Sequence, residues 1–353
     1  MALFFDGFDI YTDITATAQG LNANYLWDGA NLIAGQAGVF SYGYSVSTGS
    51  YGSNYMKKVF ANILNTPGAN WTTVYACFHL YTGGSVTGQI SAGDYGFISL
   101  WDGATRQCVL GLTAAGKLAV YQGTTLKATG TTTLAINTWY WIAVKFVIDN
   151  TTGSCRVLLN DNQEFNATNI DTQGSANAYA TEAQFRNCAD FSAARFDNVH
   201  LYDGSSAAPF DAIMTKELRC YYSLPTGNGA LTDWTPSAGS AYQCVDEIPP
   251  NTTDYISAST VGNQASFTKT ALSNVANVYA VQAMLNAWKD DAATRGLKSF
   301  LRWSNGSLFY SGEFFMSASN SYYANQWFVD PNTAAAFVVA DYDTYQFGVE
   351  VTT

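Results

Sequence analysis

The strongest constraint on the fold is the stretch from Trp139 to Ile148, "WYWIAVKFVI", which contains one charged side chain, Lys145. In an extended strand, successive side chains point to opposite faces, so this stretch is apolar on one face and nearly so on the other. Such a strand is typical of the middle of a layered β structure, where both faces are covered. We therefore predict a central strand, with Trp139 and Trp141 as core residues of an N-terminal sandwich.

A second strand is expected to pair with this one. The turn residues "DNTTG" at 149–153 are followed by "SCRVLLN" at 154–160, a second largely apolar run. Two apolar runs joined by a short polar turn predict a β-hairpin.

The composition favours strands throughout the chain. The sequence contains 23 Tyr, 21 Phe and 9 Trp against 7 Pro, and 12% of its residues are charged. Aromatic residues are enriched in strands, and this charged fraction is about half of that in an average soluble protein. We predict an all-β protein whose polar surface consists mainly of Asn, Gln, Ser, Thr and Gly.

Turn signals recur at short intervals between candidate strands, a pattern typical of a sandwich, jelly roll or barrel. The segment "DGSSAAPFDA" at 203–212 is small and polar and contains Pro209. A chain of 353 residues is long enough for two domains, each with its own core. We predict two tandem β-sandwich (jelly-roll) domains, at 1–205 and 210–353, joined by this linker.

The segment "VYAVQAMLNAW" at 278–288 fits two structures. Val278, Val281, Leu285 and Trp288 have helical spacing, whereas the residues from Tyr279 to Ala287 also alternate as in a strand. A turn and a second apolar run, "LKSFLRW" at 297–303, follow. We predict a strand that returns through 297–303, with a helix as the alternative.

The charge balance excludes two classes of partner. The formal net charge is −11, the pI is near 4.5, and the 16 basic residues are spread thinly. Nucleic acids and anionic membranes are bound through clustered Lys and Arg. A secretory signal peptide begins with a basic region, whereas the first basic residue of this sequence is Lys57. No apolar run is long enough to span a bilayer. We predict no nucleic-acid or membrane partner and no signal peptide, with synthesis in a cytoplasm.

The six cysteines form no C-x-x-C motif of the kind that zinc ribbons and redox proteins use. We interpret them as small buried apolar residues within strands. A Cys220–Cys244 disulfide within one domain is the alternative, if the protein reaches an oxidising environment.

Residues suited to catalysis are scarce. Retaining glycosidases with a jelly-roll fold carry two carboxylates about 5 Å apart on an E-x-D-x-x-E strand. That motif is absent, because the closest two glutamates in the sequence are Glu164 and Glu182. Both histidines, His79 and His200, fall in strand patterns, where a core or interface residue is expected. No G-x-S-x-G, P-loop or H-E-x-x-H motif occurs. We predict that the protein is not an enzyme and has no catalytic residue.

Two tyrosine-rich segments are candidate binding surfaces. The segments "SYGYSVSTGSYGSNY" at 41–55 and "SNSYYANQW" at 319–327 place tyrosines among small polar residues, where we expect exposure. Tyr side chains supply rigid contact area in protein interfaces and can stack on sugars. Packing within the fold is the alternative. The candidates for glycan or interface binding are Tyr42, Tyr44, Tyr51, Tyr55, Tyr322 and Tyr323.

The N-terminal half resembles the concanavalin A-like jelly rolls of the laminin G-like group, over roughly residues 1–205. The resemblance rests on "TWYWIAVKFVID" at 138–149, "GSCRVLLNDNQEF" at 153–165 and "ARFDNVHLYDG" at 194–204. It implies a fold and, by itself, no chemistry. Such domains often hold calcium in a loop of Asp, Asn and carbonyl oxygens. The candidate ligands, which otherwise serve as turn formers, are Asp94, Asp102, Asp149 and Asp161. We predict no other cofactor.

The segment 215–260 is similar to part of the virion proteins of tailed bacteriophages, which carry W-T-P-S, V-D-E-x-P-P and Y-[VI]-S motifs. The matching residues are Trp234 to Ser237, Val245 to Pro250 and Tyr255 to Ser257. The following "PNTTD" replaces a more acidic run, which argues against an acidic metal site in that loop.

This second resemblance implies a non-enzymatic structural component of a phage particle, in the tail, a fibre or the capsid surface, acting in assembly and host attachment. It also implies other virion proteins as partners, a location in the virion and a symmetric homo-oligomer. A carbohydrate-binding module or lectin, with host-surface polysaccharide as its partner, is the alternative.

Overall fold

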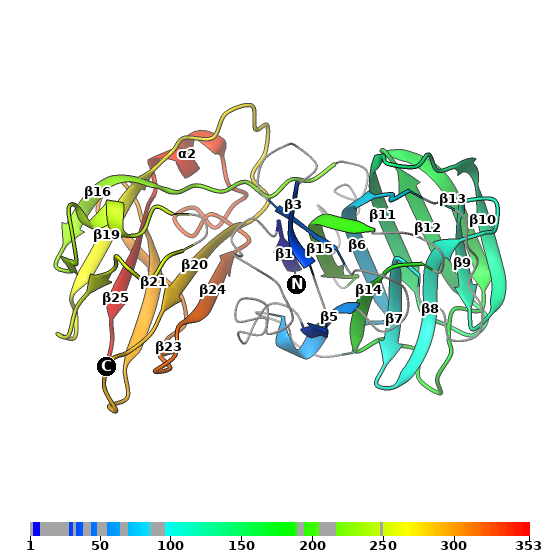
Figure 1. The fold of residues 1–353 in the computed structure, drawn as a ribbon, viewed down its shortest axis with the longest axis horizontal. Helices are drawn as coiled ribbons and strands as arrows, with labels where there is room; N and C mark the ends of the chain where they lie inside the picture. The colour runs from blue at the N-terminus through cyan, green and yellow to red at the C-terminus, as the bar shows by residue number, and fades with distance from the viewer. Residues whose placement is uncertain are drawn as a thin grey trace. The chain divides into compact units, whose positions relative to one another are not determined.

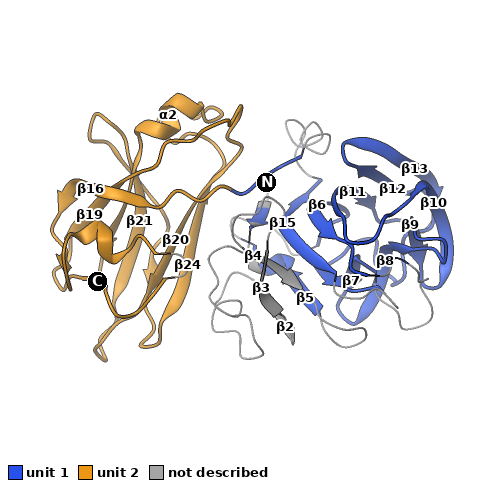
Figure 2. Ribbon diagram, turned by 45° about the horizontal axis from the view of Figure 1, so that its top comes forward, with its two compact units in different colours: residues 1–22, 26–220 blue, residues 23–25, 221–353 orange. Residues whose placement is uncertain are grey.

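The computed structural model describes residues 3–7, 28–30, 33–37, 44–47, 55–63, 70–84, 86, 96–188, 194–204, 217–247 and 250–353. These residues form two compact units, of which unit 1 extends to Cys220 and unit 2 comprises Tyr221–Thr353 (Figure 2). Most of the predicted linker at 203–212 lies outside the described residues. Both units are built almost entirely of antiparallel strands, which confirms the prediction of an all-β protein with β-sandwich domains.

Unit 1 contains two facing sheets (Figure 1). Sheet A has the strand order β13-β12-β11-β6-β15-β4-β3, and β1 also pairs with β15. Its strands are β1 (Leu3–Asp6), β3 (Ile33–Ala37), β4 (Tyr44–Ser47), β6 (Thr73–Tyr81), β11 (Trp139–Val147), β12 (Gly153–Leu159), β13 (Asn162–Ile170) and β15 (Arg195–Asp203).

Sheet B has the strand order β10-β9-β8-β7-β14-β5-β2. A single 3-10 turn, η1 (Phe60–Asn62), follows β5. The strands of sheet B are β2 (Asp28–Ala30), β5 (Tyr55–Val59), β7 (Ile98–Asp102), β8 (Thr105–Leu112), β9 (Lys117–Gln122), β10 (Thr125–Thr133) and β14 (Glu182–Arg186).

The core of unit 1 lies between the two sheets. Phe78 of β6 packs edge-on against Phe185 of β14, with ring centroids 5.4 Å apart. Ile142 of β11 is the register partner of Phe78, so it faces sheet B as well. Trp141 points to the opposite, outer face of sheet A, because side chains alternate along a strand.

The structure confirms the predicted hairpin, since β11 pairs with β12 on one side and β6 on the other. It changes the interpretation of the two tryptophans. Trp141 is 3% exposed, but it lies on the outer face of sheet A instead of between the sheets. Trp139 is half-exposed, so its predicted place in the core is wrong. Alternation shows which residues share a face, but it does not show which face meets the second sheet.

Unit 2 is a smaller sandwich. Its main sheet has the order β16-β19-β25-β21-β22, with β23 also paired to β21, and two further pairs are β20–β24 and β17–β18. The elements are β16 (Pro225–Thr232), β17 (Thr235–Pro236), η2 (Ala241–Cys244), β18 (Ile256–Ser257), β19 (Gln264–Lys269), β20 (Val281–Ala287), β21 (Gly296–Arg302), β22 (Leu308–Tyr310), β23 (Phe314–Phe315), β24 (Ser321–Trp327), α2 (Val339–Thr344) and β25 (Gln346–Val351).

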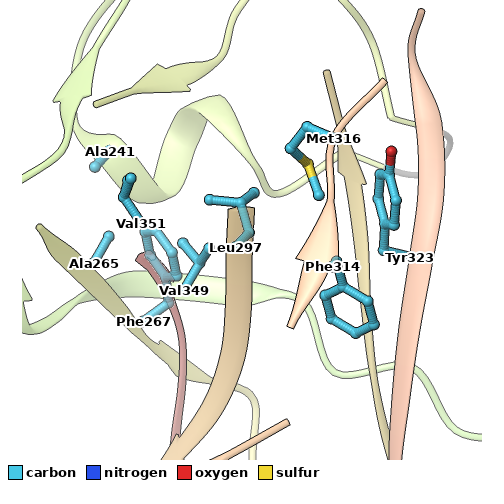
Figure 3. Close-up of a cluster of buried hydrophobic side chains, with 9 residues drawn as sticks. All are labelled: Ala241, Ala265, Phe267, Leu297, Phe314, Met316, Tyr323, Val349 and Val351. Atoms are coloured by element: carbon cyan, nitrogen blue, oxygen red, sulfur yellow. The ribbon is translucent and has the colours of Figure 1, made fainter. Parts of the chain in front are cut away.

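The ambiguous segment 278–288 contains a strand, β20, as predicted. Its partner is β24, whereas the expected return strand, β21, pairs with β25 in the main sheet. One buried cluster joins the main sheet to β24 (Figure 3). It consists of Ala241, Ala265, Phe267, Leu297, Phe314, Met316, Tyr323, Val349 and Val351. Within the part of the chain that the structure describes, no helix is long and apolar enough to cross a membrane.

Gly348 of β25 allows the ring of Phe300 on β21 to approach the backbone of β25 closely. A Cβ atom at position 348 would come within 2.2 Å of the Phe300 ring and 2.5 Å of the carbonyl oxygen of Ala265. We expect Gly348→Ala to destabilise unit 2 by about 1–3 kcal/mol through overpacking. Gly312→Ala, where nothing lies within 4 Å, is the matched control. Thermal unfolding of the two variants should separate them, and equal midpoints would contradict this packing.

Candidate functional site

The tyrosines of the predicted binding surface that the structure describes are distributed over both units. Tyr42 and Tyr51 lie outside the described residues, and of Tyr44 the structure describes the backbone in β4. Tyr55 is half-buried in β5, with the guanidinium of Arg186 4.4 Å from its ring centroid. Tyr55 belongs to unit 1, whereas Tyr322 and Tyr323 of β24 belong to unit 2.

The expected exposure of Tyr322 and Tyr323 is wrong, because they are 9% and 4% exposed. Tyr323 belongs to the cluster of Figure 3, and its hydroxyl accepts a hydrogen bond from the backbone N–H of Ser317 at 3.0 Å. Burial raises the pKa of Tyr322. The small polar residues beside them form the turn before β24, while the tyrosines themselves lie in the strand, which explains the error.

The aspartates considered as calcium ligands serve separate turns. Asp94 lies outside the described residues. Asp102 accepts hydrogen bonds from Ser175 and Asn177 at 2.8 and 2.9 Å. Backbone N–H groups of the following turn lower the pKa of Asp149 to about 2, and Asp161 occupies the turn between β12 and β13 with φ of 64°. In the described ranges, no three His, Cys, Asp or Glu side chains form a group suited to a metal ion.

The outer face of sheet A brings unusual residues together. Strands β11, β6 and β15 lie side by side, and their registers align the outward-facing side chains in four cross-strand rows. These rows are Trp139–Tyr81–Arg195, Trp141–His79–Asp197, Ala143–Cys77–His200 and Lys145–Tyr75–Tyr202. Both histidines of the chain therefore lie on one face, in adjacent rows.

A bulge at Asn198 places His200 on this face. The register of β15 against β6 shifts between Asp197 and His200, and Asn198 has φ of 47°. Asn tolerates this left-handed conformation better than most residues, and the extra residue of a bulge changes which side chains face outward. Without the bulge, alternation from Asp197 would place Val199 on the outer face and His200 on the inner one.

The segment 217–220 crosses the same face, and hydrogen bonds connect it to β6 and β15. Glu217 Oε1 lies 3.0 Å from His79 Nε2, and the backbone N–H of Cys220 donates to Asn198 Oδ1 at 2.7 Å. Cys220 Sγ in turn lies 3.9 Å from His200 Nε2. We call His79, Trp141, His200, Glu217 and Cys220 the two-histidine cluster.

Both histidines of this cluster are buried, at 2% and 6% exposure, as the sequence interpretation expected. Burial lowers the pKa of each ring to about 4, and the hydrogen bond of Glu217 to His79 partly opposes that shift. Both rings are therefore neutral at neutral pH. They pack around Trp141, whose centroid lies 4.8 Å from that of His79 and 6.2 Å from that of His200. The indole Nε1 is buried, with no hydrogen-bond partner among the described residues.

Sequence reasoning did not find Glu217 or Cys220 as members of a site. Cys220 is one of six cysteines and Glu217 one of six glutamates, and neither residue stands in a recognisable motif. Strand pairing and tertiary contacts bring positions 79, 141, 200 and 217–220 together. Their spacing along the sequence therefore forms no motif. The structure also shows all six cysteines as free thiols, with Cys220 in unit 1 and Cys244 in unit 2, which disfavours the alternative disulfide.

A neighbouring row is open to solvent. Trp139 and Tyr81 have ring centroids 5.3 Å apart, and the guanidinium of Arg195 lies 4.7 Å from the Tyr81 centroid. All three side chains are half-exposed. This row offers two aromatic rings beside a cation, in a chain with few cations.

No protein-family model and no curated protein matches the chain. Among solved structures, it is similar to an alginate lyase at 11% identity and a TM-score of 0.36, over 57% of this chain and 97% of that one. It is also similar to domain 4 of an extracellular arabinanase from Geobacillus stearothermophilus, in complex with arabinotriose, at 13% identity and a TM-score of 0.33, over 60% and 86%. A xylan β-1,4-xylosidase from Bacillus halodurans matches at 12% identity and a TM-score of 0.34, over 56% and 39%. Likeness at this level identifies neither a family nor a function.

The buried histidines make the stability of unit 1 depend on pH. Each folded-state pKa lies near 4, below the ordinary value of 6.5, so the unfolded chain binds more protons in this range. Stability is therefore fully present above about pH 6.5 and is lost as the pH falls towards about 4. We expect the unfolding midpoint of unit 1 to drop across this window. The drop should be smaller in His79→Gln, which keeps a donor for Glu217. Identical pH profiles for the two proteins would contradict the assignment.

Proposed function

We propose that this protein is a non-enzymatic structural component of a tailed-phage particle, in the tail, a fibre or the capsid surface. Its partners would be other virion proteins and further copies of the same chain. The proposal rests on the resemblance of residues 215–260 to phage virion proteins, and on the structural part that the matching residues play in unit 2.

The matching residues hold one corner of unit 2 together. Strand β17 within the first motif pairs with β18 within the third. Ser237 and Tyr255 exchange two hydrogen bonds, of 2.8 Å to the Tyr255 carbonyl and 2.9 Å to the Ser237 hydroxyl. Trp234 donates from Nε1 to the carbonyl of Asn263 at 3.1 Å.

The corner also packs on the core of unit 2. Trp234, Val245 and Ile256 lie against the cluster of Figure 3. Positions 248 and 249 of the second motif are outside the described residues. The motifs therefore encode packing and strand pairing, which supports a structural role for the segment over a catalytic one.

Purified tailed particles from the source of this sequence provide the test. Mass spectrometry should detect this chain as a stoichiometric particle component, and immunogold labelling should place it on the tail, a fibre or the capsid surface. The same antibody on particles that lack the gene product is the control. Repeated absence of the chain from intact particles would overturn the proposal.

Carbohydrate binding is a second candidate, favoured by the open row on sheet A. The rings of Trp139 and Tyr81 can stack on the apolar face of a sugar, and Arg195 can pair with a carboxylate in bidentate geometry. The row therefore fits an anionic saccharide, such as a uronic acid polymer at a host surface.

Affinity electrophoresis in gels containing alginate or polygalacturonate tests this candidate. We expect the gels to retard the wild-type protein. Trp139→Ala should weaken the binding affinity about tenfold, because it removes the stacking surface. Trp288→Ala, which removes a half-buried Trp from unit 2, is the matched control and should leave retardation unchanged. Unaltered mobility of the wild-type protein in both gels would exclude this class of ligand.

A further inference from the structure

We propose that Cys220 is a base-assisted nucleophilic thiol, with His200 as its base, and that it is a site of covalent modification by small disulfides. The inference concerns the two-histidine cluster of unit 1 and is independent of the proposed role in a particle. It rests on the geometry of Cys220, His200 and Asn198.

The hydrogen bonds determine which nitrogen of His200 is free to act as the base. Nδ1 lies 2.8 Å from the carbonyl oxygen of Asn198. A carbonyl oxygen can only accept, so Nδ1 carries the proton of the neutral ring. Nε2 therefore presents a lone pair, and it lies 3.9 Å from Cys220 Sγ. A nucleophile within reach of a base that a third group orients is the arrangement that activates a thiol.

Asn198 positions both partners of this pair. Its carbonyl oxygen orients His200, while its side-chain Oδ1 accepts the backbone N–H of Cys220 at 2.7 Å. The imidazole is further held by Phe5, stacked with a centroid distance of 6.2 Å, and by Trp141, edge-on at the same distance. Asn198 is therefore a positioning residue. The bulge at Asn198 sets the distance between Cys220 Sγ and His200 Nε2.

The other five cysteines differ from Cys220, and all six lie within the described residues. Cys77, Cys108, Cys155, Cys188 and Cys244 are buried, with at most 4% exposure. Burial raises the pKa of Cys77 to about 12 and raises those of Cys108 and Cys155 as well. Buried thiols of this kind are inert. Cys220 is partly exposed, and its Sγ lies 3.9 Å from Nε2 of His200.

The charged and titratable groups around His200 lie on the adjacent strand and on the segment 217–220. His79 and Cys77 lie on the adjacent strand β6, and Glu217 lies on the covering segment, bound to His79 and 3.4 Å from Arg219. Proton transfer from Cys220 to His200 would form an imidazolium, which the hydrogen bond from Nδ1 to the carbonyl oxygen of Asn198 favours. His79 opposes it if protonated, and the burial of His79 keeps that ring neutral.

The reaction is a thiol–disulfide exchange. The thiol proton moves to Nε2 of His200 as the sulfur attacks one sulfur of a small disulfide. A new S–S bond forms at Cys220 and the original S–S bond breaks. The leaving thiolate takes up a proton, from His200 or from water, and the second half of the disulfide is released as a thiol. The small disulfide is the oxidant in this exchange.

Native protein mixed with dithiodipyridine, whose released thione absorbs light, tests the proposal. We expect one fast equivalent per chain, mapped by mass spectrometry to Cys220, at a rate about tenfold above that of glutathione at mildly acidic pH. The rate of glutathione should fall about tenfold per pH unit, since its thiol has no neighbouring base. The rate of Cys220 should fall much less, because His200 stays unprotonated down to about pH 4.

Three variants complete the experiment. Cys220→Ser should abolish the fast phase, and His200→Gln should slow it to the rate of glutathione. Cys244→Ser, which removes a buried thiol from unit 2, is the matched control and should leave the fast phase unchanged. If His200→Gln does not fold, the pH profile of the wild-type protein decides. A Cys220 rate and pH profile equal to those of glutathione, or reaction spread over several cysteines, would overturn the proposal.

Discussion

The pairing of β6 with β11 is the interaction on which unit 1 depends. Their shared inner face supplies Phe78 and Ile142 to the core between the sheets, and their shared outer face supplies His79 and Trp141 to the two-histidine cluster. Because the inner face and the middle of the outer face of this pair are buried, the strands can be apolar over most of their length. The sandwich core and the candidate site therefore rest on the same two strands.

The bulge at Asn198 on β15 completes the two-histidine cluster beside this strand pair. A regular β15 would direct Val199 outward, and the outer face would then hold a single imidazole. The bulge places His200 next to Trp141 and leaves the amide of Asn198 available to hold Cys220. Left-handed conformations at non-glycine residues persist where the surroundings compensate their cost, and here those surroundings include the segment 217–220.

The two units suggest different kinds of function. In unit 2, the W-T-P-S and Y-[VI]-S motifs are engaged in packing and strand pairing, which accords with the structural role that we propose. In unit 1, the outer face of sheet A combines an open row of aromatic and cationic side chains with a buried pair of histidines. A structural protein with a ligand-binding or reactive face on one domain accommodates both observations, and the proposed experiments address the two units separately.

The sequence predicts the fold class, because aromatic enrichment, period-two alternation and closely spaced turn signals are typical of a sandwich, jelly roll or barrel. It also identified β11, its hairpin with β12, and β20 as a strand. The tertiary structure decided which face of β11 meets sheet B, that Tyr322 and Tyr323 are buried, and that β20 pairs with β24. It alone brought His79, His200, Glu217 and Cys220 together. The physical reason is that alternation specifies which residues share a face of one strand, whereas sheet packing, strand partners and a one-residue bulge arise from contacts between residues far apart in sequence.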